Sequence, residues 1–301
     1  MKIGIIGQGF VGTAIRTFLE EWCDHSITTY DIKDDIPFDI GYHNVVRNSE
    51  MIYLCLPTPM DKEGRCHLDI VTDALRLLNN CASAANKMPL VLIKSTMVPG
   101  TSERLQSLFN SLILVTNPEF LTERNAYEDF KNSDRHVLGI ANPHNNPQVR
   151  TVLKDYHKNL WTQAECIFVS PIEAELIKYI TNSYFSVKVT FANHMYQLCQ
   201  ELGVDYSKFI KSAVIADRRI EPTHWEVPGP DGKLGFGGSC FPKDLSGMIT
   251  LFKDNGVDAA LLETAREYNN KVRPEKDWED LVGRAVVAMK KNVSEEKECQ
   301  L

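Results

Sequence analysis

The fold is decided by residues 2–12, whose sequence is KIGIIGQGFVG. Residues 2–6 form a short apolar run of the kind that a buried parallel strand needs. The pattern G-x-G-x-x-G follows at Gly7–Gly12, and residues 13–19 have helical periodicity. The glycines of this motif allow a tight turn, the approach of a pyrophosphate and close helix–strand packing. A strand, this turn and a helix in that order predict a dinucleotide-binding fold, with the phosphates at the helix N-terminus.

The second predicted strand, residues 26–30, ends directly before Asp31. An acid at this distance from the glycines binds the adenosine ribose hydroxyls, which favours NAD over NADP. Lys33 lies close by and argues in the opposite direction. The residues predicted to bind the cofactor in this part of the chain are Gly7, Gly9, Phe10, Val11, Gly12, Asp31 and Lys33.

Further strand and helix patterns extend this unit into a Rossmann-type domain of α/β class. Strands are expected at residues 51–56, 90–93, 112–115, 137–140 and 167–169, and a helix at 68–78. Ligands bind beyond the carboxyl ends of strands in such sheets. The polar residues at those ends are Thr58, Ser95, Thr96 and Glu119. For Thr58 and Ser95, a role in building turns and caps is as consistent with the sequence as a role in binding.

The second half of the chain is predicted to be helical. Ser170, Pro171 and Glu173 have the spacing of a capping box, and apolar residues then recur at steps of three and four until Gly203. So long a helix is typical of a domain connector or a dimer surface. Shorter helices are expected at 205–216, 242–254, 257–270 and 274–290, before a polar tail at 295–299. We therefore expect an NAD-binding domain at residues 1–170 and a helical domain at residues 171–301.

Residues 235–244, GFGGSCFPKD, place one cysteine behind three glycines and before a Pro-Lys-Asp triplet. Proline suits a helix start, so Cys240 is expected near a helix N-terminus. There the helix dipole and a nearby lysine favour the thiolate, which is the nucleophilic form. A cysteine taken alone is more often a small buried residue, and its neighbours shift the interpretation toward catalysis.

Composition excludes several functional classes. The 301 residues include 43% hydrophobic and 24% charged residues, with a formal net charge of −7. That charge and the lack of a basic tract argue against nucleic-acid binding. The eight cysteines form no zinc-ligand spacing and indicate thiols in a reducing compartment. No signal-peptide pattern or membrane-length apolar run is present, so we expect a cytoplasmic protein with no membrane partner.

Taken in order, these motifs resemble the UDP-glucose 6-dehydrogenase family of nucleotide-sugar dehydrogenases. The resemblance covers residues 1 to about 280. It rests on the segments at 7–12, 56–59, 94–101, 117–121, 175–182, 219–220 and 237–244. It implies that the C6 alcohol of a nucleotide sugar is oxidised to a carboxylate with two NAD+, most simply UDP-glucose to UDP-glucuronate. N-acetylmannosamine and GDP-mannose substrates suit the same motifs.

The resemblance also implies roles for individual residues. Cys240 would capture the C6 aldehyde as a thiohemiacetal that is oxidised to a thioester, while Lys178 and Asn182 stabilise the oxyanion. Asp244 and Thr96 would position water, and Glu119 would be a general base. Cofactor contacts are implied for Thr58, Thr96, Glu123 and Lys243. Substrate contacts are implied for Glu119, Phe120, Leu121, Lys178, Asn182, Phe236, Gly237 and Cys240, and for Arg219 reaching across a homodimer formed through the long helix.

The chain departs from the family pattern in three places. Family members carry a third α/β domain that holds much of the nucleotide, and residues 1–301 are expected to contain only the first two domains. Arg124 follows Glu123 where the family usually has glycine or serine nearby. The stretch before Gly235 is longer than usual.

Two other functions fit parts of the sequence. A two-electron hydroxyacid dehydrogenase of the 6-phosphogluconate or 3-hydroxyisobutyrate type would share the domain layout and a Lys-x-x-x-Asn helix, but it has no need of Cys240. A non-catalytic subunit that only binds NAD would not need the whole set of polar residues. One NADH per substrate would favour the first alternative, and NAD binding without affinity for any UDP-sugar would favour the second.

Overall fold

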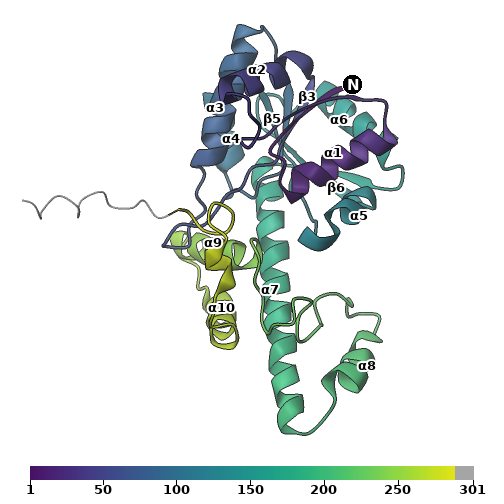
Figure 1. The fold of residues 1–301 in the computed structure, drawn as a ribbon, viewed down its shortest axis with the longest axis vertical. Helices are drawn as coiled ribbons and strands as arrows, with labels where there is room; N and C mark the ends of the chain where they lie inside the picture. The colour runs from purple at the N-terminus through teal and green to yellow at the C-terminus, as the bar shows by residue number, and fades with distance from the viewer. Residues whose placement is uncertain (289–301) are drawn as a thin grey trace, which may run out of the picture.

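The structure, a computed structural model, describes residues 1–288, of which the first part forms a seven-stranded sheet (Figure 1). The strand order is β2-β1-β3-β4-β5-β6-β7, and all neighbours pair in parallel except β5 and β6. In register, Gly4 lies between Thr28 and Ile52. The strands are β1 (Lys2–Ile6), β2 (Ser26–Tyr30), β3 (Met51–Leu54), β4 (Leu90–Ile93), β5 (Ile113–Thr116), β6 (Arg135–Ile140) and β7 (Glu165–Val169).

Helices cover both faces of this sheet and bury two separate apolar cores. One core packs α2 (Phe38–Asn48), α3 (Asp69–Ala84) and α4 (Thr101–Leu108) against one face. The other packs α1 (Phe10–Trp22), α5 (Ala126–Lys131) and α6 (Pro147–Leu160) against the opposite face. Because both faces are covered, the central strands β3 and β4 consist of hydrophobic residues along their whole length, as a buried parallel sheet requires.

The long helix α7 (Pro171–Glu201) leads away from the sheet (Figure 1). It begins with the predicted capping box, in which Ser170 and Glu173 satisfy each other's backbone N–H groups. Helices α9 (Phe241–Asp254) and α10 (Ala260–Val272) pack beside its first half. Its second half carries a lobe with a π-helical turn at Tyr206–Ile210 and α8 (Lys211–Ile215).

This architecture confirms the predicted α/β class, with a Rossmann-type sheet followed by a helical region. The boundary predicted at residue 170 falls between β7 and α7. Asp205 caps the turn at the start of the helix predicted over residues 205–216, since its carboxylate accepts a hydrogen bond of 2.8 Å from Lys208 N. Within the described part of the chain, no helix combines the length and apolarity that crossing a membrane requires.

The helix predicted at 274–290 is wrong over residues 274–288. This stretch contains a 3₁₀ turn at Asp277–Asp280 and then an irregular segment. Lys276 and Gly283 have positive φ angles of 44° and 79°, which an α-helix cannot contain. The segment instead pairs with Met60, whose N–H donates to Ala285 O at 2.8 Å. The last two residues of that predicted helix and the polar tail at 295–299 lie outside the described residues.

Candidate active site

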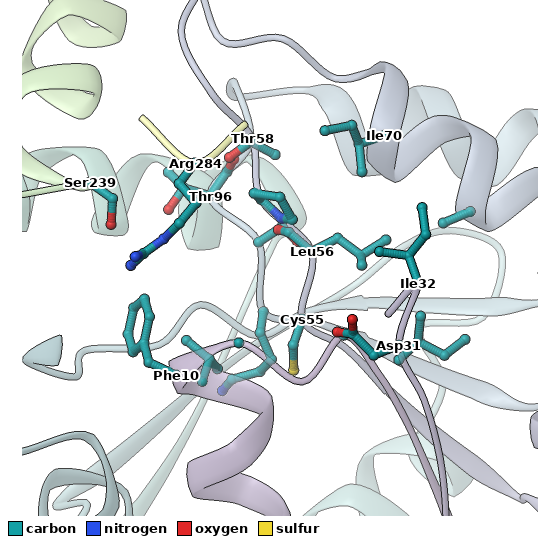
Figure 2. Close-up of a pocket in the computed structure, with 18 of the residues that line it drawn as sticks. Phe10, Asp31, Ile32, Cys55, Leu56, Thr58, Ile70, Thr96, Ser239 and Arg284 are labelled. Atoms are coloured by element: carbon teal, nitrogen blue, oxygen red, sulfur yellow. The ribbon is translucent and has the colours of Figure 1, made fainter. Parts of the chain in front are cut away.

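A cavity of about 690 Å³ opens beyond the carboxyl ends of β1 and β3 (Figure 2). The strand order reverses between these two strands, which makes this the topological switch point of the sheet. This is the place where open α/β sheets bind their ligands. The segments after β1, β2, β3, β4 and β5 all contribute to its wall, together with Cys240 from the helical region. Residues predicted from distant parts of the sequence therefore meet at one cavity. The predicted residues that line it are Gly7, Gly9, Phe10, Val11, Asp31, Lys33, Thr58, Thr96, Glu119, Glu123, Cys240 and Lys243.

The turn after β1 has the shape of a phosphate cradle. Gly7 has a φ of +89°, and a Cβ on Gly12 would lie 1.9 Å from Gly7 O, so both positions require glycine. A Cβ on Gly9 would meet nothing within 4 Å, which shows that open space lies over the turn. The Asp31 carboxylate accepts hydrogen bonds from the N–H groups of Gln8, at 2.6 Å, and Lys33, at 3.0 Å. The residues present therefore fit a dinucleotide whose ribose reaches Asp31 and whose pyrophosphate lies at the start of α1.

Cys240 is the N-cap residue of α9, as the sequence predicts, with Pro242 in the first turn. The expectation of a thiolate is not met in this state. Burial raises the pKa of the Cys240 thiol, and the nearby Lys243 ammonium only partly offsets that rise. Lys243 is itself held by Asp244, which weakens its pull on the sulfur. The direction of this pKa shift favours the protonated thiol in this state.

Glu119 at the cavity wall forms a buried ion pair with Lys178, which is not among the lining residues. Lys178 Nζ lies 2.9 Å from Glu119 Oε1, and the two side chains are only 4% and 7% exposed. The second oxygen of Glu119 accepts a hydrogen bond of 2.6 Å from Leu121 N. The aromatic ring of Phe120 lies 5.6 Å from the same ammonium. A predicted base and a predicted oxyanion donor thus neutralise each other beside Cys240.

A second buried group connects α7 to the start of α9. Asp244 is 1% exposed. Its carboxylate accepts hydrogen bonds from Asn182 Nδ2 at 2.6 Å and Lys243 Nζ at 2.5 Å. Burial alone would lower the pKa of Lys243, but the adjacent Asp244 carboxylate and the thiols of Cys240 and Cys66 raise it above its ordinary value. Lys243 therefore stays charged at the floor of the cavity.

The hydroxyl groups of Thr58 and Ser95 tie two loops together. Thr58 Oγ1 donates to Thr96 O at 2.7 Å, and Ser95 Oγ donates to Leu56 O at 2.6 Å. These bonds hold the loop after β3 against the loop after β4. Both residues also line the cavity, so their structural role is observed and their binding role stays a prediction.

Three predicted substrate residues lie elsewhere. Phe236 is buried, and its N–H and C=O groups bond to the side chain of Asn269, so it holds the loop that precedes Cys240. Gly237 packs on the Arg273 guanidinium. Arg219 lies at the surface with its side chain 83% exposed and paired with Asp217. It does not line this protomer's cavity.

Two cationic residues line the cavity without having been assigned a role from the sequence. Lys94 is buried and donates to Asn117 Oδ1 at 3.0 Å, and burial lowers its pKa to about 8. A lysine directly after an apolar strand is a signal that could have drawn attention to it. Arg284 reaches the cavity from the segment after α10 and pairs with Glu123 at 2.5 Å. That segment carries no motif that would have identified it.

Comparison with known proteins agrees with this geometry. Two family profiles match, described as the UDP-glucose/GDP-mannose dehydrogenase family, NAD binding domain at residues 33–159 and central domain at 172–271. A UDP-glucose 6-dehydrogenase of Rickettsia bellii is 30% identical over 91% of this chain and 68% of its own length. A solved UDP-glucose dehydrogenase of Pyrobaculum islandicum is 27% identical, with a TM-score of 0.77 over 90% of this chain and 68% of that one.

A further solved structure shares the fold alone. It is a Mycobacterium tuberculosis 3-hydroxyisobutyrate dehydrogenase that is 16% identical, with a TM-score of 0.65 over 91% of this chain and 94% of its own. The chain spans between 56% and 70% of the length of the curated relatives it matches.

Proposed function

Because the chain belongs to the UDP-glucose/GDP-mannose dehydrogenase family and contains its NAD binding domain, we propose that it oxidises the C6 alcohol of a nucleotide sugar to a carboxylate with two NAD+. We propose UDP-glucose as the substrate and UDP-glucuronate as the product. The observation that carries the proposal is the position of Cys240, which lines the same cavity as the dinucleotide cradle. A four-electron oxidation passes through a covalent carrier or a hydrated aldehyde between its two hydride transfers, and a thiol supplies the covalent carrier.

The chemistry balances with the groups at hand. The alcohol loses a hydride from C6 and a proton from its oxygen, which gives the aldehyde. The Cys240 sulfur then bonds to C6 while the thiol proton passes to the aldehyde oxygen, and this gives a thiohemiacetal. Loss of a second hydride and the hydroxyl proton leaves a thioester. Water cleaves the C6–sulfur bond and releases the carboxylate, the thiol and one proton. The nicotinamide of each bound NAD+ supplies the hydride acceptor.

The side chains around Cys240 have charges that suit these steps. Glu119 is the proposed proton acceptor for the alcohol, and it can act once Lys178 turns from it toward the substrate oxygen. Lys178 and Asn182 would then stabilise negative charge on that oxygen. Asp244, held by Asn182 and Lys243, is proposed to orient the hydrolytic water together with Thr96.

Counting products tests the proposal. Purified protein is incubated with NAD+ and each of a panel of UDP- and GDP-sugars, and NADH and carboxylate are quantified together. We expect two NADH for each carboxylate formed from UDP-glucose. One NADH per substrate would instead indicate a two-electron dehydrogenase. NAD binding by calorimetry with no binding or turnover of any nucleotide sugar would indicate a non-catalytic subunit.

We also propose that two chains associate through α7. One face of this helix exposes Ile180, Tyr184, Phe191, Leu198 and Leu202, each by half or more of its surface. Their spacing places them along one side of the helix. Such a face supports an interface that would bring Arg219 toward a neighbouring protomer. Light scattering should give the mass of a dimer, and the Phe191→Glu variant the mass of a monomer. The exposed Met88→Glu variant is the control, and a monomeric parent protein would contradict the proposal.

We also propose that the protein is cytosolic. The seven cysteines within the described residues are all unpaired, which suits a reducing compartment. Protein purified without reductant and then denatured should show eight reactive thiols, one for each cysteine of the sequence. A lower number caused by native disulfides would contradict this placement.

A further inference from the structure

Residues 274–288, the segment after α10 that we call the strap, are fixed to the loop following β3. Met60 N donates to Ala285 O at 2.8 Å, and Val287 N donates to Met60 O at 3.0 Å. These bonds flank Arg284 on its C-terminal side, so its backbone is held beside the cavity. The backbone of Arg284 is therefore fixed next to a cavity that can hold a ligand.

The Arg284 side chain enters the cavity near the start of α1. Figure 2 shows its guanidinium directed toward the side of the cavity where Phe10, the first residue of α1, lies, while Asp31 lies on the opposite side. The first turn of α1 contains no acidic residue. This is the place where the helix N-terminus and the glycine turn present backbone N–H groups to a phosphate.

The present partner of Arg284 is easily exchanged. Its Nη2 lies 2.5 Å from Glu123 Oε1, and the two side chains are 44% and 46% exposed. Pairs with this exposure contribute little stability. A guanidinium binds a phosphate through two parallel hydrogen bonds as well as it binds a carboxylate.

The other cationic side chains that line the cavity either have partners of their own or lie away from the start of α1. Lys94 bonds to Asn117, and Lys243 is held by the buried Asp244. Lys33, which also lines the cavity, is two residues from Asp31 in the sequence, and Figure 2 shows Asp31 on the opposite side of the cavity from Arg284. Among the described residues that line the cavity, Arg284 is therefore the cation placed to neutralise charge at the start of α1.

We propose that Arg284 binds the pyrophosphate of the dinucleotide, releasing Glu123 as it does so. This inference rests on the proposed function, because it requires a dinucleotide in the cavity. It adds a cofactor-binding residue that comes from the strap and not from the sheet. It also gives Glu123 a second role, as the group that holds Arg284 in position before the cofactor arrives.

Calorimetric titration with ADP-ribose, which has the pyrophosphate but no nicotinamide, tests the inference. Arg284→Ala should weaken ADP-ribose binding by about 10- to 100-fold, the range expected for charged hydrogen bonds. Adenosine, which carries no phosphate, should bind the variant as it binds the parent protein. Arg284→Lys should recover part of the lost affinity. The control is Arg65→Ala, because Arg65 is a similarly exposed arginine, paired with Asp254, that does not line the cavity.

Glu123→Gln provides the second arm of the test. It should bind ADP-ribose as tightly as the parent or more tightly, since Arg284 no longer has to leave a carboxylate. In combination with Arg284→Ala it should show no such gain. Unchanged ADP-ribose affinity in Arg284→Ala, or an equal loss of adenosine affinity, would overturn the inference while leaving the proposed function intact. A parent protein that binds neither NAD+ nor ADP-ribose would overturn both.

Discussion

Replacing Asp244 with asparagine removes one charge from a buried pair while keeping the shape of the side chain. Asp244 and Lys243 have side chains only 2% and 9% exposed, and their charged atoms lie 2.5 Å apart. The asparagine oxygen can still accept the hydrogen bond from Asn182. The variant therefore leaves the Lys243 ammonium buried without its counter-charge.

The expected loss is large because an uncompensated buried charge is costly. Removing one partner of a buried pair lowers the free energy of unfolding by about 3–5 kcal/mol. Lys243→Met should cost about the same, since it strands the Asp244 carboxylate. The double variant Lys243→Met/Asp244→Asn has no stranded charge, and we expect it to lose only about 1–2 kcal/mol. The coupling free energy between the two positions is then at least about 4 kcal/mol.

Urea unfolding of the four proteins, followed by circular dichroism, measures this coupling. A matched cycle at the exposed pair Lys253 and Glu263, with side chains 55% and 30% exposed, should give about 0.2–1 kcal/mol. If the losses of the two single variants at the buried pair simply add, to within about 0.5 kcal/mol, the ion pair is not the source of the stability and the reasoning fails.

Three further predictions concern separate parts of the molecule. Gly12→Ala places a Cβ 1.9 Å from Gly7 O and should weaken NAD+ binding by at least about 10-fold. An unchanged dissociation constant would contradict the prediction that this Cβ crowds the turn. Because burial raises the pKa of Cys240, its alkylation rate without ligands, followed by peptide mass spectrometry, should still increase at about pH 9, and a plateau below about pH 8 would show a thiolate already formed. Glu175→Ala removes the carboxylate that accepts from Ser102 N and Oγ at 2.8 and 2.7 Å, and should lower the free energy of unfolding by about 3 kcal/mol in urea, whereas Glu175→Gln should lose less than half of that.

The sheet could be predicted because its signals are local. The strand, glycine turn and helix at residues 2–22 are adjacent in sequence, and each has its own pattern of apolar residues or glycines. The capping box at Ser170 likewise lies within four residues. The sequence pattern did not predict the direction of β6, which runs antiparallel to β5. Strand direction depends on which way the connecting segment returns, and residues 117–134 carry no periodicity that settles it.

The last predicted helix shows where local patterns fail. Apolar residues recur between 274 and 288, but the backbone there is held by pairing with Met60, more than two hundred positions earlier. A contact at that separation leaves no periodic trace in the sequence. The role of Arg284 was missed for the same reason, because its position depends on this pairing.

The site was predicted as a set of residues but not as a set of pairs. The family resemblance pointed to Lys178, Glu119, Asn182 and Asp244. The partnerships of Lys178 with Glu119 and of Asn182 with Asp244 depend instead on how α7 meets the sheet and α9. The protonation of Cys240 depends on the same packing, since burial outweighs the attraction of Lys243. Charge state is therefore the property that sequence reasoning anticipated least well.

The central claim is that the Cys240 thiol carries the sugar between its two oxidations. The most direct test is the rate of carboxylate formation by Cys240→Ser at saturating NAD+ and UDP-glucose, with binding of both ligands checked separately. A serine hydroxyl is a poorer nucleophile than a thiol, so the account predicts a rate at least about 100-fold below that of the parent protein, with ligand binding retained. Carboxylate formation at the parent rate would contradict it.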